Sequence, residues 1–306
     1  MNQQIFETTP LSIIDITGAD AATIIHNLTT NTVVGLETGQ GNECFVTDVR
    51  GKTLGHVSLY RRDNLIRLIG PGGQSERIAQ HVDRYTIRED ATAVIRDDDF
   101  SSVVIAPQLA GELAPGLVED TVLREVEIAI ANTKAHLYGC RWLGEGSGVL
   151  LFEAADRDSI LRELSSRRGG ELGDERHFHQ CRIRARFPWY GIDLDETNLP
   201  QEADRDSVAI SFTKGCYLGQ ETVARLDALG QVQKKLVNWS IQGGVPEPGI
   251  ALKAGEKTVG RLTSVAAEGD QGAIAIGPAR RSHFDVGSTA EGVLDPGSIK
   301  ITATVI

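Results

Sequence analysis

The sequence predicts an α+β protein that ends in a small β-barrel. Strand and helix patterns alternate over the first 233 residues, without the regular strand–helix–strand repeat of a doubly wound sheet. From Lys234 onward, short strand patterns alternate with turns rich in Gly and Pro, which is typical of a barrel. A chain of 306 residues is long enough for two or three domains. We therefore expect an α+β region of two subdomains over 1–233 and a barrel over 234–306.

The composition is ordinary for a soluble globular protein, with 41% hydrophobic and 24% charged residues. A net charge of −11 argues against a broad nucleic-acid-binding surface, because neutralising phosphates requires clustered Lys and Arg. No apolar stretch approaches the ~18 residues that span a bilayer. The first residues carry neither a basic segment nor an apolar run. We expect a cytoplasmic protein without membrane contact.

The four cysteines, at positions 44, 140, 181 and 216, do not form a Cys-x-x-Cys pair. Their spacing matches neither a zinc finger nor a ferredoxin, so the sequence predicts no metal site. Reduced thiols in a cytosolic protein are the simplest interpretation.

The α+β region divides into segments with recognisable periods. Asp20 and Asp156 are each placed to cap a following helix. The turn at 48–52 joins two halves of a hairpin. Gly- and Pro-interrupted stretches predict loops at 107–115 and 138–148. The predicted strands are 11–18, the hairpin 44–60, 64–70, 92–95, 101–106, 128–131 and 149–153, and the predicted helices are 21–28, 74–84 and 157–168.

The C-terminal region shows only strand patterns. The predicted barrel strands are 234–241, 250–252, 259–265, 272–276 and 299–305.

Three arginines alternate with apolar residues in the segment 182–187. As a strand, this segment would place Arg182, Arg184 and Arg186 on one face, whereas a helix would spread them. Three parallel cations need anions. Salt bridges with some of the 42 acidic residues are one interpretation, and a carboxylate-rich ligand is the other.

The most unusual stretch is the octet 214–221, Lys-Gly-Cys-Tyr-Leu-Gly-Gln-Glu. It predicts a loop that opens a helix over 221–229, which Gly230 closes. A thiol near a helix start and beside Lys214 is expected to have a lowered pKa, which makes Cys216 a candidate reactive group. The alternative is a glycine-rich turn around a small buried cysteine.

The octet resembles the signature of the YgfZ-type proteins, folate-binding relatives of the glycine-cleavage T-protein (aminomethyltransferase) that are implicated in iron–sulfur cluster assembly or repair. Further motifs of these relatives occur in the right order along the chain. The resemblance implies a T-protein-like clover arrangement of two interleaved α+β domains and a C-terminal β-barrel. The further motifs are matched at Arg182, Pro188, Gly191 and Asp193, at 198–203, and at 259–264.

The resemblance also implies a folate site in the central cavity, for tetrahydrofolate or a polyglutamylated folate. Phe178 matches an aromatic residue that the relatives link to folate, and Arg182, Arg184 and Tyr190 complete the predicted site. The chain departs from the pattern at Arg184, which stands where the T-protein has a pterin-binding Glu, and at Leu11, which replaces a second aromatic residue.

For the octet, the resemblance implies that Cys216 is the reactive thiol at the cavity mouth and that Lys214 activates it. Gly215, Tyr217, Gly219, Gln220 and Glu221 are the remaining motif residues.

The functional hypothesis is a folate-binding protein that supports iron–sulfur cluster assembly or repair, with iron–sulfur proteins or assembly factors as partners. Gly55 and His56 stand where the T-protein enzymes have catalytic carboxylates, so the resemblance implies that aminomethyl transfer is absent. Two alternatives stay open: a tetrahydrofolate-dependent aminomethyltransferase, and a non-catalytic scaffold with a buried Cys216. Whether the chain is an enzyme is left open.

Overall fold

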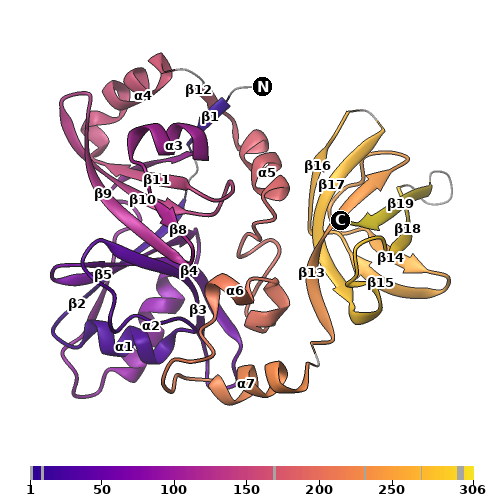
Figure 1. Ribbon diagram of the computed structural model, residues 1–306, viewed down its shortest axis with the longest axis horizontal. Coiled ribbons are helices and arrows are strands. Elements are labelled where there is room, and N and C mark those ends of the chain that lie inside the picture. The colour runs from indigo at the N-terminus through magenta and orange to yellow at the C-terminus, as the bar shows by residue number, and fades with distance from the viewer. Residues whose placement is uncertain (1–2, 8–9, 168–169, 231, 270, 295–299) are drawn as a thin grey trace.

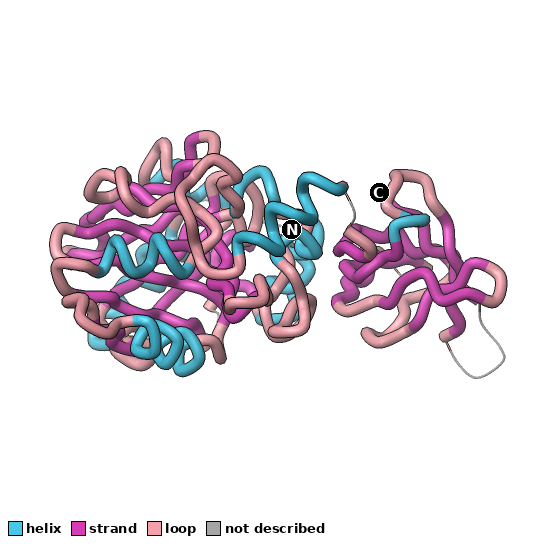
Figure 2. Tube along the Cα trace, turned by 90° about the horizontal axis from the view of Figure 1, so that it is seen from below, coloured by secondary structure: helices cyan, strands magenta, loops and turns pink. Residues whose placement is uncertain are grey.

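The computed structural model describes residues 3–7, 10–167, 170–230, 232–269, 271–294 and 300–306. Two bodies lie side by side, a large one built on one long sheet and a smaller barrel (Figures 1 and 2). Helix α5 and the segment after it run between them (Figure 1), and α5 packs on strands β16 and β17 of the barrel.

The large sheet has twelve strands among the described residues, in the order β12-β1-β7-β11-β10-β9-β3-β4-β5-β2-β6, with β8 on β9. Its halves are interleaved. The first strand, β1, lies among the later strands of the chain, while the next, β2, lies near the opposite end. The strands are β1 Gln3–Phe6, β2 Leu11–Thr17, β3 Gln40–Thr47, β4 Thr53–Arg62, β5 Leu65–Pro71, β6 Thr92–Ile95, β7 Ser101–Ile105, β8 Val118–Glu119, β9 Val122–Ile130, β10 Thr133–Cys140, β11 Ser147–Phe152 and β12 Glu171–Gly173.

Some helices lie on the large sheet, and others lie in the part of the chain that leads from the sheet to the barrel. Their bounds are α1 Ala21–Leu28, α2 Ser75–Tyr85, α3 Pro107–Leu113, α4 Arg157–Ser166, α5 Glu175–Arg184, α6 Asp206–Ala209 and α7 Gln220–Leu229, with short 3₁₀ turns at Ala154–Asp156, Pro200–Ala203 and Arg281–His283. Among the described helices, none combines the length and apolar character that crossing a bilayer requires.

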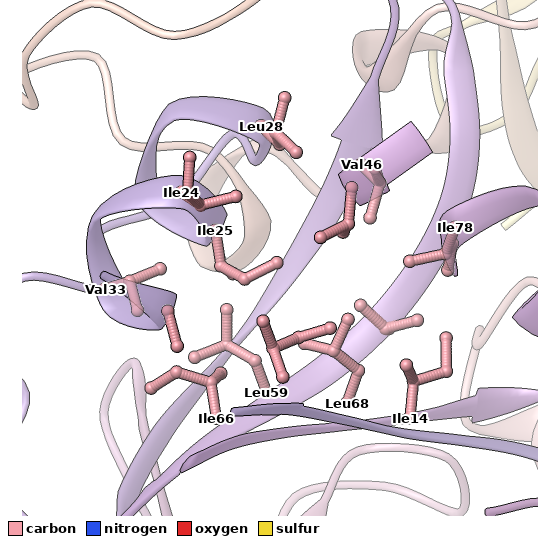
Figure 3. Close-up of a cluster of buried hydrophobic side chains, with 14 of the residues drawn as sticks. Ile14, Ile24, Ile25, Leu28, Val33, Val46, Leu59, Ile66, Leu68 and Ile78 are labelled. Carbon is pink, nitrogen blue, oxygen red and sulfur yellow. The ribbon is translucent and has the colours of Figure 1, made fainter. Parts of the chain in front are cut away.

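The first half of the sheet owes its rigidity to an aliphatic cluster beneath α1 and α2. Figure 3 shows Ile25 of α1 and Ile78 of α2 gathered with Leu59 and Leu68 of the sheet, and all four are buried. Each such side chain contributes about 1.5–3 kcal/mol when fully buried. This cluster gives the loops at the end of α1 a fixed base.

The C-terminal strands close into a barrel. In the described part, the strands form a closed ring in the order β13-β19-β18-β14-β15-β17, and β17 pairs with β13. Strand β16 pairs with β17 on the same side as β15, further along β17. The domain boundary at 233/234 stays a prediction. The strands are β13 Lys234–Gln242, β14 Ala251–Ala254, β15 Lys257–Arg261, β16 Ser264–Ala267, β17 Gly272–Arg280, β18 Thr289–Val293 and β19 Lys300–Val305.

Most predicted elements are confirmed, and several differ. The Gly- and Pro-interrupted region 107–115 contains α3, and the loop predicted at 138–148 contains the end of β10 and the start of β11. Among the described strands, β1, β8, β10, β12 and β18 have no predicted counterpart. The single strand predicted over 259–265 is two strands, broken at Leu262 and Thr263. Residue 299 of the last predicted strand lies outside the described residues. Asp20 and Asp156 precede helices as expected, but their side chains make no capping hydrogen bond.

Of the two conformations considered for the arginine segment, the structure has the helix, since α5 runs through Arg184. The Asp174 side chain caps this helix by accepting a hydrogen bond from the backbone N–H of His177 at 2.7 Å. The helix ends at Ala185, and Arg186 takes a left-handed backbone conformation with φ of 60°. The arginines therefore point in different directions.

Candidate functional site

The octet is a loop that opens a helix, as the sequence predicts. Helix α7 begins at Gln220 after Gly219, and Gly230 closes it in the left-handed conformation with φ of 56°. Glu221 is an exposed residue of the first turn. Tyr217 is buried in a cluster with Phe45 and Val223, which anchors the middle of the loop.

Lys214 fixes the start of the loop. Its ammonium donates to the carbonyl oxygens of His26, Thr29 and Asn31 at 2.6, 2.7 and 2.8 Å, which uses all three N–H donors. It also lies 4.9 Å from the centre of the Tyr217 ring. Burial lowers the pKa of Lys214 to about 8, with Cys44 opposing the shift. The cation thus sits on carbonyls at the end of α1 and is not directed at the neighbouring thiol.

Among the octet residues, Gly219 lies against the backbone of another segment, near Asp48. Its φ is 80°, and an added Cβ would lie 2.4 Å from the carbonyl oxygen of Asp48. The loop therefore packs directly on the turn between β3 and β4. Gly215 differs, since an added Cβ there would meet nothing within 4 Å. Only the second glycine of the motif is required by packing.

Cys216 is the exposed thiol of the described chain. Cys44 and Cys140 are buried, and burial raises their pKa values to about 12 and about 11. Cys181 is partly buried, and burial raises its pKa as well. The alternative of a buried Cys216 is therefore wrong.

A cavity of about 330 Å³, here called the aromatic cavity, lies between α5, the start of β2 and the loop after Trp189. It contains two of the predicted folate residues, Phe178 and Tyr190. Its size is at the lower end of the range for small-molecule sites. The lining residues are Glu7, Pro10, Gly72, Glu175, Phe178, His179, Trp189, Tyr190, Gly191 and Ile192.

The aromatic rings of this cavity hold each other in place. Phe178 and Trp189 meet edge to face with ring centres 5.1 Å apart. The Tyr190 hydroxyl donates to the carbonyl of Thr53 at 3.1 Å and accepts from Arg77 at 2.8 Å. Burial raises the pKa of Tyr190 to about 12. These residues form a preformed apolar wall, in which the Phe178 and Trp189 rings stand nearly perpendicular to each other.

Polar groups stand at the rim of the aromatic cavity. The Nδ1 atom of His179 accepts a hydrogen bond from Arg182 at 2.7 Å, so the ring proton lies on Nε2. Burial, followed by the charge of Arg182, lowers the pKa of His179. Glu175, in the first turn of α5, adds a solvent-accessible carboxylate. The cavity thus offers one N–H donor and two carboxylates beside aromatic rings, and of the carboxylates Glu7 is paired with Arg157.

Arg182 does not act as a free cation. Its side chain is 1% exposed and donates to His179, to Asp193 and Ser264 at 2.7 Å, and to the carbonyl of Phe187. This network joins α5 to the barrel. Four of the five guanidinium N–H groups are used in this way and the side chain is buried, so the structure does not favour the predicted use of Arg182 for a glutamate tail.

Arg184 is exposed and lies 3.4 Å from Glu268 of the barrel. Arg184 does not line the aromatic cavity. Arg182 pairs with Asp193, and Arg184 pairs with Glu268. The salt-bridge interpretation of the arginine segment is therefore confirmed for these two residues.

A second cavity of about 460 Å³, here called the neighbouring cavity, adjoins the aromatic cavity. His179 and Ile192 line both. Arg176, an exposed residue one turn before Gln180 on α5, lines the neighbouring cavity. Glu175 and Arg176 were missed in the sequence because they precede the segment with recognisable motifs.

A buried polar cluster surrounds His56, which stands at the hairpin position that lacks a carboxylate in this sequence. The His56 ring is stacked between Phe45 and Phe187, with centres 4.6 and 5.2 Å away. Its Nε2 atom lies 2.8 Å from Glu43, which also accepts two hydrogen bonds from Arg205. Burial would raise the pKa of Glu43, but the charge of Arg205 and the hydrogen bonds from His56 and Arg205 lower it below its ordinary value. Glu43 is thus a paired structural carboxylate.

The structure does not bring all predicted site residues together. Phe178 and Tyr190 share the aromatic cavity, whereas Cys216 and Lys214 are absent from its lining. Cys216 therefore does not line the aromatic cavity, and its place at the mouth of a folate cavity stays a prediction. Within the described ranges, no group of three or more His, Cys, Asp or Glu side chains could hold a metal ion.

Several characterised proteins are similar in sequence. No protein-family model matches the chain. It is 26% identical over 269 residues to a probable aminomethyltransferase of Natronomonas pharaonis, which covers 85% of this chain and 74% of that one. It is 25% identical over 241 residues to the tRNA-modifying protein YgfZ of Yersinia enterocolitica, with 74% and 68% covered. It is 26% identical over 258 residues to the mitochondrial iron–sulfur cluster assembly factor IBA57 of Mus musculus, with 78% and 67% covered.

The fold is that of a solved T-protein. The glycine cleavage system aminomethyltransferase T of Bartonella henselae superposes with a TM-score of 0.80 at 16% identity, covering 99% of this chain and 85% of that one. The predicted T-protein-like α+β fold with a C-terminal barrel is therefore confirmed.

Proposed function

Because the chain is a distant relative of the aminomethyltransferase, YgfZ and IBA57 proteins, we propose that it is a folate-binding protein that supports iron–sulfur cluster assembly or repair. The observation that carries the proposal is the exposed Cys216 on a loop fixed by Lys214 and Gly219. An exposed thiol in a fixed position can transiently bind iron or accept a sulfur or one-carbon fragment. One cysteine does not hold a cluster, which takes about four protein ligands. The partners are therefore iron–sulfur proteins or assembly factors, and we place the protein in the cytoplasm.

The aromatic cavity is the proposed folate site. A pterin is flat and carries N–H donors along one edge. The rings of Phe178, Trp189 and Tyr190 offer apolar surface, and the carboxylate of Glu175 offers two acceptor oxygens for those donors. Glu175 would thereby compensate for Arg184, which stands where the T-protein has its pterin-binding Glu.

The glutamate tail of the folate would extend into the neighbouring cavity. Tail carboxylates need a cation, and the lining of the aromatic cavity includes neither Arg nor Lys. The two cavities meet at His179 and Ile192, and Arg176 lies in the second. Arg182 also lines the second cavity but is buried and paired with Asp193, so the exposed Arg176 replaces it as the proposed tail-binding residue.

Aminomethyl transfer is the competing function, because several of the similar proteins are named aminomethyltransferases. The hairpin position at His56 offers a stacked imidazole, and the nearby Glu43 is neutralised by Arg205. A carboxylate paired in this way is a poor general base. Turnover of an aminomethyl donor with tetrahydrofolate would overturn our assignment.

The test uses cells that lack the protein and depend on it for a [4Fe–4S] enzyme. We expect Cys216→Ser to lose support of that enzyme while the purified variant keeps its melting temperature. Cys181→Ser, at a partly buried thiol, is the control and should support the enzyme as the wild type does. Full enzyme activity with Cys216→Ser would contradict the proposed role.

A further inference from the structure

A third cavity, here called the Arg186 cavity, lies where the segment after α5 meets the barrel. Its volume is about 360 Å³, within the range of small-molecule sites. Its walls come from the residues that follow α5, from the segment 203–205, from β13 and from the residues after the turn at Arg281–His283. It shares no lining residue with the aromatic cavity or the neighbouring cavity. The function proposed above makes no use of it.

Arg186 is the third arginine of the segment 182–187, and it lacks an anion. The other two arginines pair with acidic side chains. Among the described groups, the carboxyl end at Ile306 included, none forms an ion pair or a hydrogen bond with the exposed Arg186 side chain. Neither interpretation of the arginine segment is therefore satisfied at this position by the protein itself.

Arg186 also occupies a backbone position that favours glycine. Its φ is 60°, and the backbone N–H groups of Arg186 and Phe187 close helix α5 on the carbonyls of Ile183 and Arg182. The left-handed residue after a helix is most often Gly, because a Cβ is disfavoured in this conformation. The position thus carries a long cationic side chain against the local preference, and no described group uses its charge. Such a conflict is expected at functional positions.

Arg205 brings a second guanidinium group to the lining of this cavity. Its Nε and Nη2 atoms donate to Glu43, whereas Nη1 has no hydrogen-bond partner among the described groups and is not sealed from solvent. The third cation of the lining, Lys235, donates to Asp204 at 2.9 Å. Glu43 and Asp204 thus balance two of the three cations, and the charge of Arg186 is left over.

Much of the remaining lining is apolar. Val286 is 78% exposed and stands at the rim. A single positive charge beside apolar walls suits a ligand with one negative charge and an apolar body. A phosphate dianion would exceed that charge and leave the apolar walls without a contact. The apolar residues include Leu236, Ile276, Phe284, Val286 and Val305.

We propose that the Arg186 cavity is a second binding site, which takes a monocarboxylate whose apolar body is about the size of an aromatic ring system. The carboxylate accepts paired hydrogen bonds from the guanidinium of Arg186, whose planar fork matches a carboxylate. The free Nη1 of Arg205 is a second donor, and the apolar body packs against Phe284 and Val286. The assignment holds whether or not the protein binds folate, because the cavities used for folate are separate from this one.

The test titrates benzoate and indole-3-acetate into the purified protein by ligand-observed NMR at millimolar concentration. Benzamide and indole-3-acetamide have nearly the same shapes without the charge and are the matched controls. We expect at least one carboxylate to bind, and its amide to bind at least about tenfold more weakly, since a charge-assisted hydrogen bond is worth about that factor or more. No binding of either carboxylate, or equal binding of the amides, would overturn the proposal.

Arg186→Gly separates a binding role from a structural one. Glycine suits the left-handed backbone, so this variant should keep or raise the melting temperature while it weakens binding of the carboxylate at least about tenfold. Arg184→Gln, at an arginine that faces Glu268 outside the cavity lining, should bind as the wild type does. Unchanged binding by Arg186→Gly, or a lowered melting temperature of this variant, would contradict the assignment.

A second variant locates the ligand without touching an arginine. Val286→Glu adds a negative charge at the exposed rim and should also weaken binding of the carboxylate at least about tenfold. Val293→Glu, at a barrel residue that is 48% exposed and does not line the cavity, is the matched control and should leave binding unchanged. Equal binding by these two variants would place the ligand elsewhere and overturn the proposal.

Discussion

The ammonium of Lys214 donates a hydrogen bond to the carbonyl oxygen of Asn31 at 2.8 Å, across 183 positions of the chain. The same ammonium binds the carbonyls of His26 and Thr29. Cations are stabilising at the carboxyl end of a helix, where carbonyl groups lack intrahelical partners. The first residue of the motif thus attaches the thiol-bearing loop to the end of α1.

Lys214→Met should destabilise the protein and loosen the loop. Three partly buried carbonyls lose their donor, and an unsatisfied group costs about 1–3 kcal/mol when fully buried, less where water enters. We expect a loss of about 2–4 kcal/mol in the free energy of unfolding, measured by urea denaturation. Lys257→Met, at an exposed lysine of β15, should change it by less than about 0.5 kcal/mol. Equal stability of the two variants would contradict the anchoring role.

The two glycines of the motif should respond differently to alanine. Gly219→Ala combines a positive φ with a Cβ placed 2.4 Å from a backbone oxygen, so we expect a loss of at least about 2 kcal/mol. Gly215→Ala meets open space and should be tolerated within about 0.5 kcal/mol. Thermal unfolding of both variants checks this, and a tolerant Gly219 would mean that the loop does not pack on the β3–β4 turn.

One thiol should react first with iodoacetamide in the native protein. Cys216 is exposed, whereas burial protects Cys44 and Cys140 and raises their pKa values to about 12 and about 11. Because the thiolate is the reacting form, these two should stay unmodified at pH 8. Peptide mass spectrometry over time identifies the labelled residue. Faster labelling of any other cysteine would conflict with the structure.

Asp206 should make the stability depend on pH. Burial, followed by the charges of Asp204 and Asp227, raises its pKa to about 6. The folded state therefore binds a proton more tightly than the unfolded state, so this residue's contribution falls as the pH rises from about 4 to about 6. Asp206→Asn should raise the unfolding free energy by roughly 1–2 kcal/mol at pH 7 and leave it unchanged at pH 4. Asp63→Asn, at an exposed aspartate, is the control, and a gain at pH 4 would contradict the assignment.

Arg176→Ala should weaken a polyglutamylated folate more than the monoglutamate. The longer tail reaches further into the neighbouring cavity, where this guanidinium is exposed. A charge-assisted hydrogen bond is worth about 1.5–3 kcal/mol, so we expect a loss of about tenfold or more for the polyglutamate. Arg184→Ala serves as the matched control, because Arg184 faces Glu268. Equal losses for both folates would rule out the tail site.

The sequence predicted those elements whose turn residues and apolar spacing match the environment that the fold gives them. The octet is such a case, since Gly219 and Gly230 mark the two ends of α7. For the arginine segment the alternation of charged and apolar residues left strand and helix open, because the helix cap at Asp174 lay outside the segment considered. The pairing of Arg182 with Asp193 and Ser264 depends on how α5 docks on the barrel, which no local pattern encodes.

The most direct measurement is a calorimetric titration of tetrahydrofolate into the wild type, Cys216→Ala and Ile192→Trp. Ile192 is 46% exposed at the rim of the aromatic cavity, so a tryptophan there should block entry without disturbing the core. Val293→Trp, at a residue 48% exposed on the barrel, controls for the added ring. We expect the wild type, Cys216→Ala and Val293→Trp to bind alike and Ile192→Trp to bind at least about tenfold more weakly. No binding to the wild type, or unchanged binding to Ile192→Trp, would contradict a folate site in this cavity.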